Sequence, residues 1–207
     1  MKRNADMVDW TTIAIGAAVG LVGGAILSKL SDPERALPQW RKDFLALARD
    51  YADREVPYQW GGGRSPSDYG VDCSGLLIQA QKFATAQGSN PPPLPPEGQT
   101  STVWNEALPK IDVPKPGDMA LYGSGGRASH VVMVEKWDPD TQTASIIGAN
   151  GGDKDVNSPA VAAARGAFVR RAPTHLYRDG FLGFTSFDVA NAYGSYALTR
   201  KPVLCCD

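Results

Sequence analysis

Cysteine and histidine, the side chains best suited to nucleophilic catalysis near neutral pH, are scarce in this sequence. The 207 residues include two histidines and three cysteines: His130, His175, Cys73, Cys205 and Cys206. So few ligands argue against a zinc cluster, and we expect no metal and no cofactor. An odd number of cysteines, two of them adjacent, is also a poor disulfide framework. The chemistry left to consider is a cysteine nucleophile paired with a histidine base.

Cys73 lies where the sequence predicts the first turn of a helix. Apolar residues recur at spacings of three and four from about Asp72 to Gln87, and Gly88 then ends the pattern. Unpaired N–H groups at a helix start lower the pKa of a thiol there, and they can also stabilise an oxyanion. The alternative is that Cys73 is a small buried hydrophobic residue, the usual role of a free cysteine.

His130 begins the run SHVVMVEKW, which has the composition of a β-strand. A strand can hold an imidazole rigidly against a helix end, where the ring would remove the proton of a thiol. The alternative is a hydrogen-bonded strand histidine with no catalytic role. His175 follows Pro173-Thr174 in a late loop, and we expect it to be structural.

The elements that would position this pair follow an α+β pattern, with helices before strands. A first helix is predicted from about Gln39 to Arg54 by its apolar stripe, and Pro57 ends it. Four later segments, rich in β-branched and apolar residues, are predicted as strands: 118–122, 129–137, 143–150 and 166–171. Turn signals separate these segments, so we expect an antiparallel sheet. The proline-rich residues 89–98 are expected to form an extended surface segment.

Residues 10–28 carry no charge and are predicted to form a hydrophobic helix. A helix of that length rises about 28 Å, close to the thickness of the hydrocarbon core of a bilayer. We favour a single membrane anchor. The alternatives are a cleaved signal peptide and a helix packed in a protein assembly, which Gly16, Gly20 and Gly24 would suit. The expected organisation is an anchor over residues 1–30, a domain over 31–185 and a C-terminal tail over 186–207.

The charge balance excludes a strongly basic nucleic-acid-binding protein. Lysine and arginine number 21 and the acidic residues 22, which gives a formal net charge of -1. No cluster of basic residues stands out that could neutralise a polyanion, so we expect no nucleic acid among the partners.

Four short motifs occur in a fixed order along the chain. They are Tyr58-Gln59-Trp60-Gly61-Gly62, Asp72-Cys73-Ser74-Gly75, Pro116-Gly117-Asp118 and Ser129-His130-Val131. Taken together, they resemble the NlpC-type cell-wall peptidases, a family of papain-like cysteine peptidases. The resemblance runs from about Trp40 to Phe184. It implies an α+β, papain-like NlpC-type core in which N-terminal helices pack on an antiparallel sheet, here preceded by one hydrophobic helix.

The resemblance also implies roles for the residues of these motifs. Cys73 matches the nucleophile of the family and His130 its general base. Tyr58 matches a tyrosine whose hydroxyl faces the reacting carbonyl, where it would assist the oxyanion.

Three further residues are candidates for binding the substrate. Asp72 and Ser74 match residues that contact the amino end of the peptide in some members, and we place Trp60 in the same substrate-binding group. For Asp72 the alternative is that its side chain caps the following helix.

The third catalytic position departs from the family pattern. The family places a histidine or a smaller polar residue on the strand after the catalytic histidine, and the matching residue here is Gly148, which has no side chain. Asn150 lies two residues on, hence on the same face of the strand, and its amide oxygen could accept the N–H of His130. We propose Asn150 as the residue that orients the imidazole. The alternatives are a main-chain carbonyl and Asp153.

The activity implied by the resemblance is hydrolysis of amide bonds in peptidoglycan stem peptides. The bond expected to be cleaved is one that follows D-glutamate. The alternatives are an amidase or acyltransferase acting on another substrate, and a non-catalytic binding or assembly subunit on a degraded hydrolase fold. The expected partners are a stem peptide, the membrane through residues 10–28, and proteins of a virion or membrane complex. The expected location is the membrane, with the catalytic domain facing the periplasm or cell wall, or a phage virion.

Overall fold

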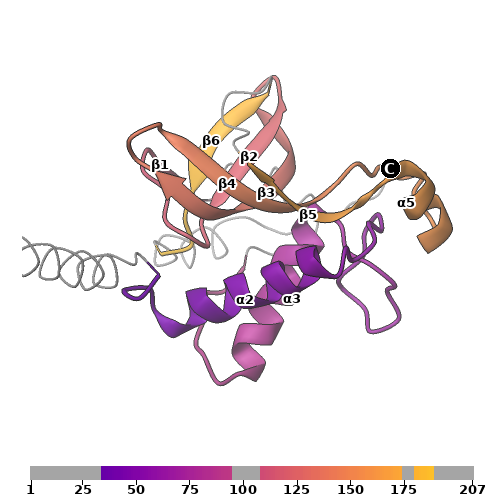
Figure 1. Cartoon of the computed structure of the whole chain (residues 1–207), viewed down its shortest axis with the longest axis horizontal. Coiled ribbons are helices and arrows are strands. Elements are labelled where there is room, and N and C mark those ends of the chain that lie inside the picture. The colour runs from indigo at the N-terminus through magenta and orange to yellow at the C-terminus, as the bar shows by residue number, and fades with distance from the viewer. Residues whose placement is uncertain (1–33, 95–107, 174–179, 189–207) are drawn as a thin grey trace, which may run out of the picture. The chain divides into compact units, whose positions relative to one another are not determined.

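The computed structural model describes residues 34–94, 108–173 and 180–188 (Figure 1). The chain divides into two compact units, residues 1–37 and 38–207. The predicted anchor over residues 10–28 lies outside the described residues, as do His175, Cys205 and Cys206. Among the residues that are described, no helix has the length and apolar character needed to cross a membrane.

The two predicted helices are confirmed to within a residue or two. Helix α2 spans Gln39–Asp53 and helix α3 spans Cys73–Ala86. Both turn an apolar stripe inward, and the stripe residues that are fully buried are Phe44, Leu45 and Ala48 of α2 and Leu76, Leu77, Ala80 and Ala84 of α3. The periodic pattern predicts these helices well because burial of that stripe is what stabilises them.

A third helix, α5 (Pro159–Arg165), was not predicted. Its ends carry ordinary signals: the Ser158 side chain accepts the N–H of Val161, proline occupies the first turn, and Gly166 ends the helix in the left-handed conformation. Seven residues are too few to show a periodic apolar stripe, so the sequence pattern gave no helix there.

The strands form one antiparallel sheet in the order β1-β6-β2-β3-β4-β5. The four predicted strands are confirmed, with small shifts at their ends, as β2 (Met119–Ser124), β3 (Arg127–Asp138), β4 (Thr143–Asn150) and β5 (Phe168–Pro173). Two strands were not predicted, β1 (Lys110–Ile111) and β6 (Phe181–Thr185). Strand β6 pairs with β1 and β2, which are distant from it in sequence. The sequence therefore contains no hairpin signal that predicts β6.

The two faces of the sheet have different neighbours. One face packs against α2 and α3, and ion pairs from α2, Arg49–Glu135 and Asp53–Arg171, join the two layers (Figure 1). The opposite face carries its own apolar cluster, whose buried members include Tyr122, Val132, Val134, Ile146 and Phe184. Because side chains alternate along a strand, each central strand contributes to both faces.

A buried arginine connects α2 to the start of β2. Arg41 has no exposed surface, and its guanidinium donates to the Pro116 carbonyl (2.8 Å) and to the Asp118 carboxylate (2.7 Å). It also donates to the Ser186 hydroxyl (3.0 Å) and pairs with the Asp188 carboxylate (2.9 Å). The motif that begins at Pro116 therefore serves as an anchor of the sheet on α2.

Candidate active site

The segment before α3 is held between two parts of the domain. The N–H of Tyr58 donates to the carbonyl of Ala167 (2.9 Å), just before β5, and the N–H of Gln59 donates to the carbonyl of Val71 (3.1 Å). Tyr58 also forms a parallel bridge with Val71, next to the start of α3. These main-chain bonds bring the Tyr58 motif beside the Cys73 motif, as the resemblance implies.

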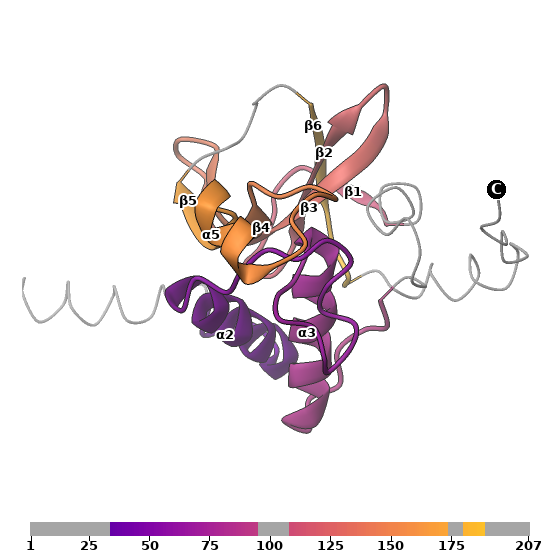
Figure 2. The same cartoon turned by 90° about the vertical axis from the view of Figure 1, so that its right-hand side faces the viewer.

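Cys73 is the first residue of α3, and the start of that helix is directed at the sheet (Figure 2). Helix α3 contacts strand β3, and main-chain groups of Val131 and Ser74 act to lower the pKa of the thiol. Val131 follows His130 directly in β3. The structure thus brings the predicted nucleophile to the strand that carries the predicted base.

The protonation of Cys73 differs from the sequence-based expectation. Burial, and then the negative charge of Asp72, raise the pKa of the thiol to about 11, while the hydrogen bonds from Val131 and Ser74 act in the opposite direction. The prediction that the helix start lowers this pKa is therefore wrong, because removal from water outweighs the helix dipole. At neutral pH the side chain is a thiol, and its attack on a carbonyl requires a base.

Asp72 is the N-cap of α3, the alternative predicted for it. One carboxylate oxygen accepts the N–H of Gly75 (2.6 Å) and the hydroxyl of Ser74 (3.0 Å). The other accepts the N–H of Gly61 (3.0 Å) and a guanidinium N–H of Arg64 (3.1 Å). The carboxylate is thus bonded on both oxygens and is only 9% exposed.

Arg64, which no sequence motif indicates as a site residue, connects this cap to its neighbours. Its guanidinium donates to the Ser74 hydroxyl (2.8 Å) and to the Gly62 carbonyl (2.8 Å) in addition to Asp72. Asp72 and Ser74, predicted to bind substrate, therefore belong to a network within the chain in which a guanidinium compensates the carboxylate charge. Trp60, the third predicted substrate-binding residue, is close to this network in sequence. Its side chain is 60% exposed.

A β-bulge immediately precedes His130. Tyr122 of β2 pairs with His130, whereas the next residue, Gly123, pairs with Ala128, so Ser129 is the extra residue of β3. Such bulges increase the local twist of a strand and redirect its side chains. The imidazole also lies near the Tyr122 ring, with 6.3 Å between ring centroids.

Asn150 contacts His130 across the sheet. The Nε2 atom of His130 lies 3.0 Å from Oδ1 of Asn150, and Nδ2 of Asn150 donates to the Gly148 carbonyl (2.9 Å). The second bond determines which end of the amide faces the ring. Because an amide oxygen only accepts, Nε2 must carry the hydrogen in this arrangement, and the lone pair of the neutral ring is then on Nδ1.

Gly148, the residue that matches the third family position, lies next to Val132. A Cβ atom at Gly148 would be 2.6 Å from Cγ1 of Val132 and 3.3 Å from Nδ2 of Asn150. A side chain there would clash with Val132 and crowd the asparagine amide. Asn150 is therefore the side chain that contacts His130. Asp153, the alternative candidate for orienting His130, instead accepts a hydrogen bond from Arg165 (2.9 Å).

Tyr58 is buried, at 4% exposure, and its hydroxyl stays protonated. Burial is the main cause that raises the pKa of Tyr58, followed by the charges of Cys73, Asp72 and Asp153. A protonated phenol can donate a hydrogen bond to an oxyanion. The ring lies against the main chain of Gly152, where a Cβ atom would approach its Cδ1 to 2.0 Å. Only glycine leaves the ring in this position.

The comparison with known families identifies the chain. A family model described as "NlpC/P60 family" matches residues 55–160, just over half of the chain. The chain belongs to the NlpC/P60 family. The matched range includes Tyr58, Cys73, His130 and Asn150, so the family resemblance stated from the motifs is confirmed.

Solved structures of this family resemble the chain at low sequence identity. A Staphylococcus aureus protein described as similar to lipoprotein, NLP/P60 family, aligns with a TM-score of 0.46 and 18% identity over 72% of this chain and 41% of that one. The NlpC/p60 domain of the peptidoglycan hydrolase SagA aligns with a TM-score of 0.44 and 23% identity over 70% of this chain and 97% of that one. The chain thus matches less than half the length of the staphylococcal protein. No curated protein sequence matches it significantly.

Proposed function

We propose that this NlpC/P60 member is a peptidoglycan hydrolase that cleaves an amide bond of the stem peptide with Cys73 as the nucleophile. The observation that carries the proposal is one arrangement: a cysteine at the start of a helix that contacts β3, the strand whose histidine bonds through Nε2 to an asparagine. Nucleophilic catalysis by cysteine requires three groups: a nucleophile, a base, and a residue that orients the base.

The first half of the reaction forms a thioester. Nδ1 of His130 removes the proton of the Cys73 thiol as sulfur attacks the amide carbonyl, and the carbonyl oxygen becomes an oxyanion. The N–H groups at the start of α3 and the protonated hydroxyl of Tyr58 are the donors proposed to stabilise it. The imidazolium then transfers its proton to the leaving nitrogen, the C–N bond breaks, and a free amine departs.

The second half restores the enzyme. Neutral His130 removes a proton from water, and the hydroxide oxygen attacks the thioester carbonyl. The C–S bond breaks, the acyl part leaves as a carboxylic acid, and the imidazolium returns its proton to sulfur. Asn150 accepts the Nε2 hydrogen throughout, so it stabilises each imidazolium intermediate.

The substrate and bond are tested by digestion of purified peptidoglycan followed by mass analysis of the soluble fragments. The expected product is a stem peptide shortened by cleavage of an amide, with a new amino group on one fragment and a new carboxylate on the other. Fragments that arise only from cleavage of the sugar chain would contradict the proposal, as would the absence of any fragment. A product joined to a new amine instead of water would indicate acyl transfer.

A further inference from the structure

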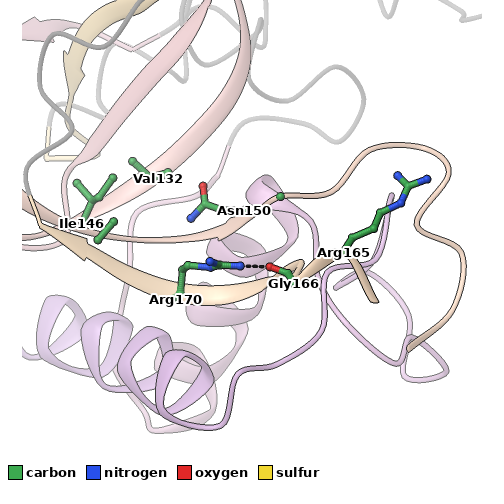
Figure 3. Close-up of a pocket in the computed structure, with 8 residues that line it drawn as sticks. Val132, Ile146, Asn150, Arg165, Gly166 and Arg170 are labelled. Atoms are coloured by element: carbon green, nitrogen blue, oxygen red, sulfur yellow. Dashed lines mark hydrogen bonds between the residues drawn. The ribbon is translucent and has the colours of Figure 1, made fainter. Parts of the chain in front are cut away.

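A pocket lies next to Asn150 on the face of the sheet that bears Val132 and Ile146 (Figure 3). Its volume is about 340 Å³, and its lining includes apolar side chains at one end and Arg165, Gly166 and Arg170 at the other. Asn150 connects the pocket to the active site, because the same amide bonds to His130. A ligand in this pocket would therefore lie one side chain away from the imidazole.

The space in this part of the sheet depends on a glycine. Gly148 of β4 pairs with Arg170 of β5, and on its other side it adjoins Val132 of β3. Any side chain at this position would meet Val132 and Asn150. The absence of a side chain at Gly148 leaves room beside the arginine.

Arg170 supplies a positive charge with no carboxylate partner among the residues that the structure describes. Its guanidinium is exposed and donates to the Gly166 carbonyl (Figure 3). One carbonyl uses only part of the five N–H donors of a guanidinium. Arg165 differs, since it extends away from Asn150 in Figure 3 and pairs with Asp153.

We propose that Arg170 is a substrate-binding residue, and that this pocket receives a free carboxylate of the peptide substrate. The inference rests on the proposed function for the identity of the substrate. A planar guanidinium binds a carboxylate through two parallel hydrogen bonds, and it does so better than a lysine can. With Arg165 neutralised by Asp153, the pocket keeps a single positive charge, which matches one carboxylate.

The test measures binding separately from catalysis. Two peptides are titrated into the Cys73→Ala protein by calorimetry: a stem peptide with its free carboxylates, and the same peptide with every carboxylate converted to a carboxamide. We expect the acid to bind about tenfold more tightly than the amide, the effect of one charge-assisted contact. Adding Arg170→Gln should reduce this ratio to about one, and Arg170→Lys should give an intermediate ratio.

Arg54→Gln is the matched control, because it removes the same charge from an exposed arginine that pairs with Asp50 elsewhere on the domain. This variant should keep the tenfold preference. A preference for the acid that survives Arg170→Gln would overturn the inference, and so would equal binding, or no binding, of the two peptides by the parent protein. Cleavage by the protein with Cys73 intact is measured in parallel. A carboxylate-dependent affinity without cleavage contradicts only the proposed function, and cleavage without any acid preference contradicts only the role of Arg170.

Discussion

Replacing Asn150 by alanine removes the hydrogen-bond acceptor of His130 while leaving the nucleophile and base in the chain. The bond joins Nε2 and Oδ1 at 3.0 Å in a partly buried setting. Such a bond contributes about 1 kcal/mol when the imidazole is neutral and about 1.5–3 kcal/mol when it is protonated. Only the difference accelerates the reaction, because the contribution to the neutral ring is present before the chemistry starts.

The difference of about 0.5–2 kcal/mol corresponds to a loss of about 2- to 30-fold in kcat. The loss should appear mainly in kcat, because the bond to His130 strengthens only when the imidazole becomes protonated. The assay is steady-state cleavage of a soluble stem peptide, followed by chromatography of the released fragments. Asn157→Ala is the matched control, an exposed asparagine in the following loop, and it should leave kcat unchanged.

Asn150→Asp tests the same contact through the pH dependence of the reaction. A carboxylate beside the imidazole favours the protonated ring, so the pKa of His130 should rise and the acidic limb of the kcat/KM profile should move to higher pH. If Asn150→Ala keeps the full kcat and Asn150→Asp leaves the profile in place, another group orients His130 and the reasoning is refuted.

Three further substitutions test the surrounding structure. Arg41→Ala leaves a buried carboxylate without its partner and should lower the free energy of unfolding by about 3–5 kcal/mol, measured by urea denaturation; an unchanged midpoint would contradict the role of this arginine. With the C-terminal cysteines removed, alkylation of Cys73 by iodoacetamide should accelerate with pH up to about pH 11, and Asp72→Asn should shift the curve to lower pH; a rate that is flat from pH 6 upward would refute the raised pKa. Gly152→Ala should displace the Tyr58 ring and lower kcat while the protein stays folded by circular dichroism, and an unaltered kcat would show that Tyr58 does not assist the reaction.

Much of the fold could be predicted because its signals are local. Apolar spacing predicts α2 and α3, since each helix buries one stripe, and the four strands β2 to β5 follow from short β-branched runs separated by turns. Strand β6 could not be found in this way. Its partners are β1 and β2, which precede it by more than fifty residues, and a five-residue segment carries too little pattern to predict such a pairing.

The site shows the same division between local and distant information. The contact between Asn150 and His130 could be predicted because alternation along a strand places Asn150 on the same face as Gly148. The hydrogen-bond networks of Arg41 and Arg64 could not be predicted, because their partners are brought near only in the folded chain. The pKa of Cys73 was predicted in the wrong direction because the helix start is visible in the sequence whereas the burial of the thiol is not.

The role of Cys73 as nucleophile is the central claim, and one comparison tests it most directly. Equal amounts of the unaltered protein and of Cys73→Ala are incubated with purified peptidoglycan, and the soluble stem-peptide fragments are quantified by mass spectrometry. The account predicts fragments from the unaltered protein and none above background from Cys73→Ala, with both proteins folded. Cleavage of the same bond by Cys73→Ala at a comparable rate would contradict it.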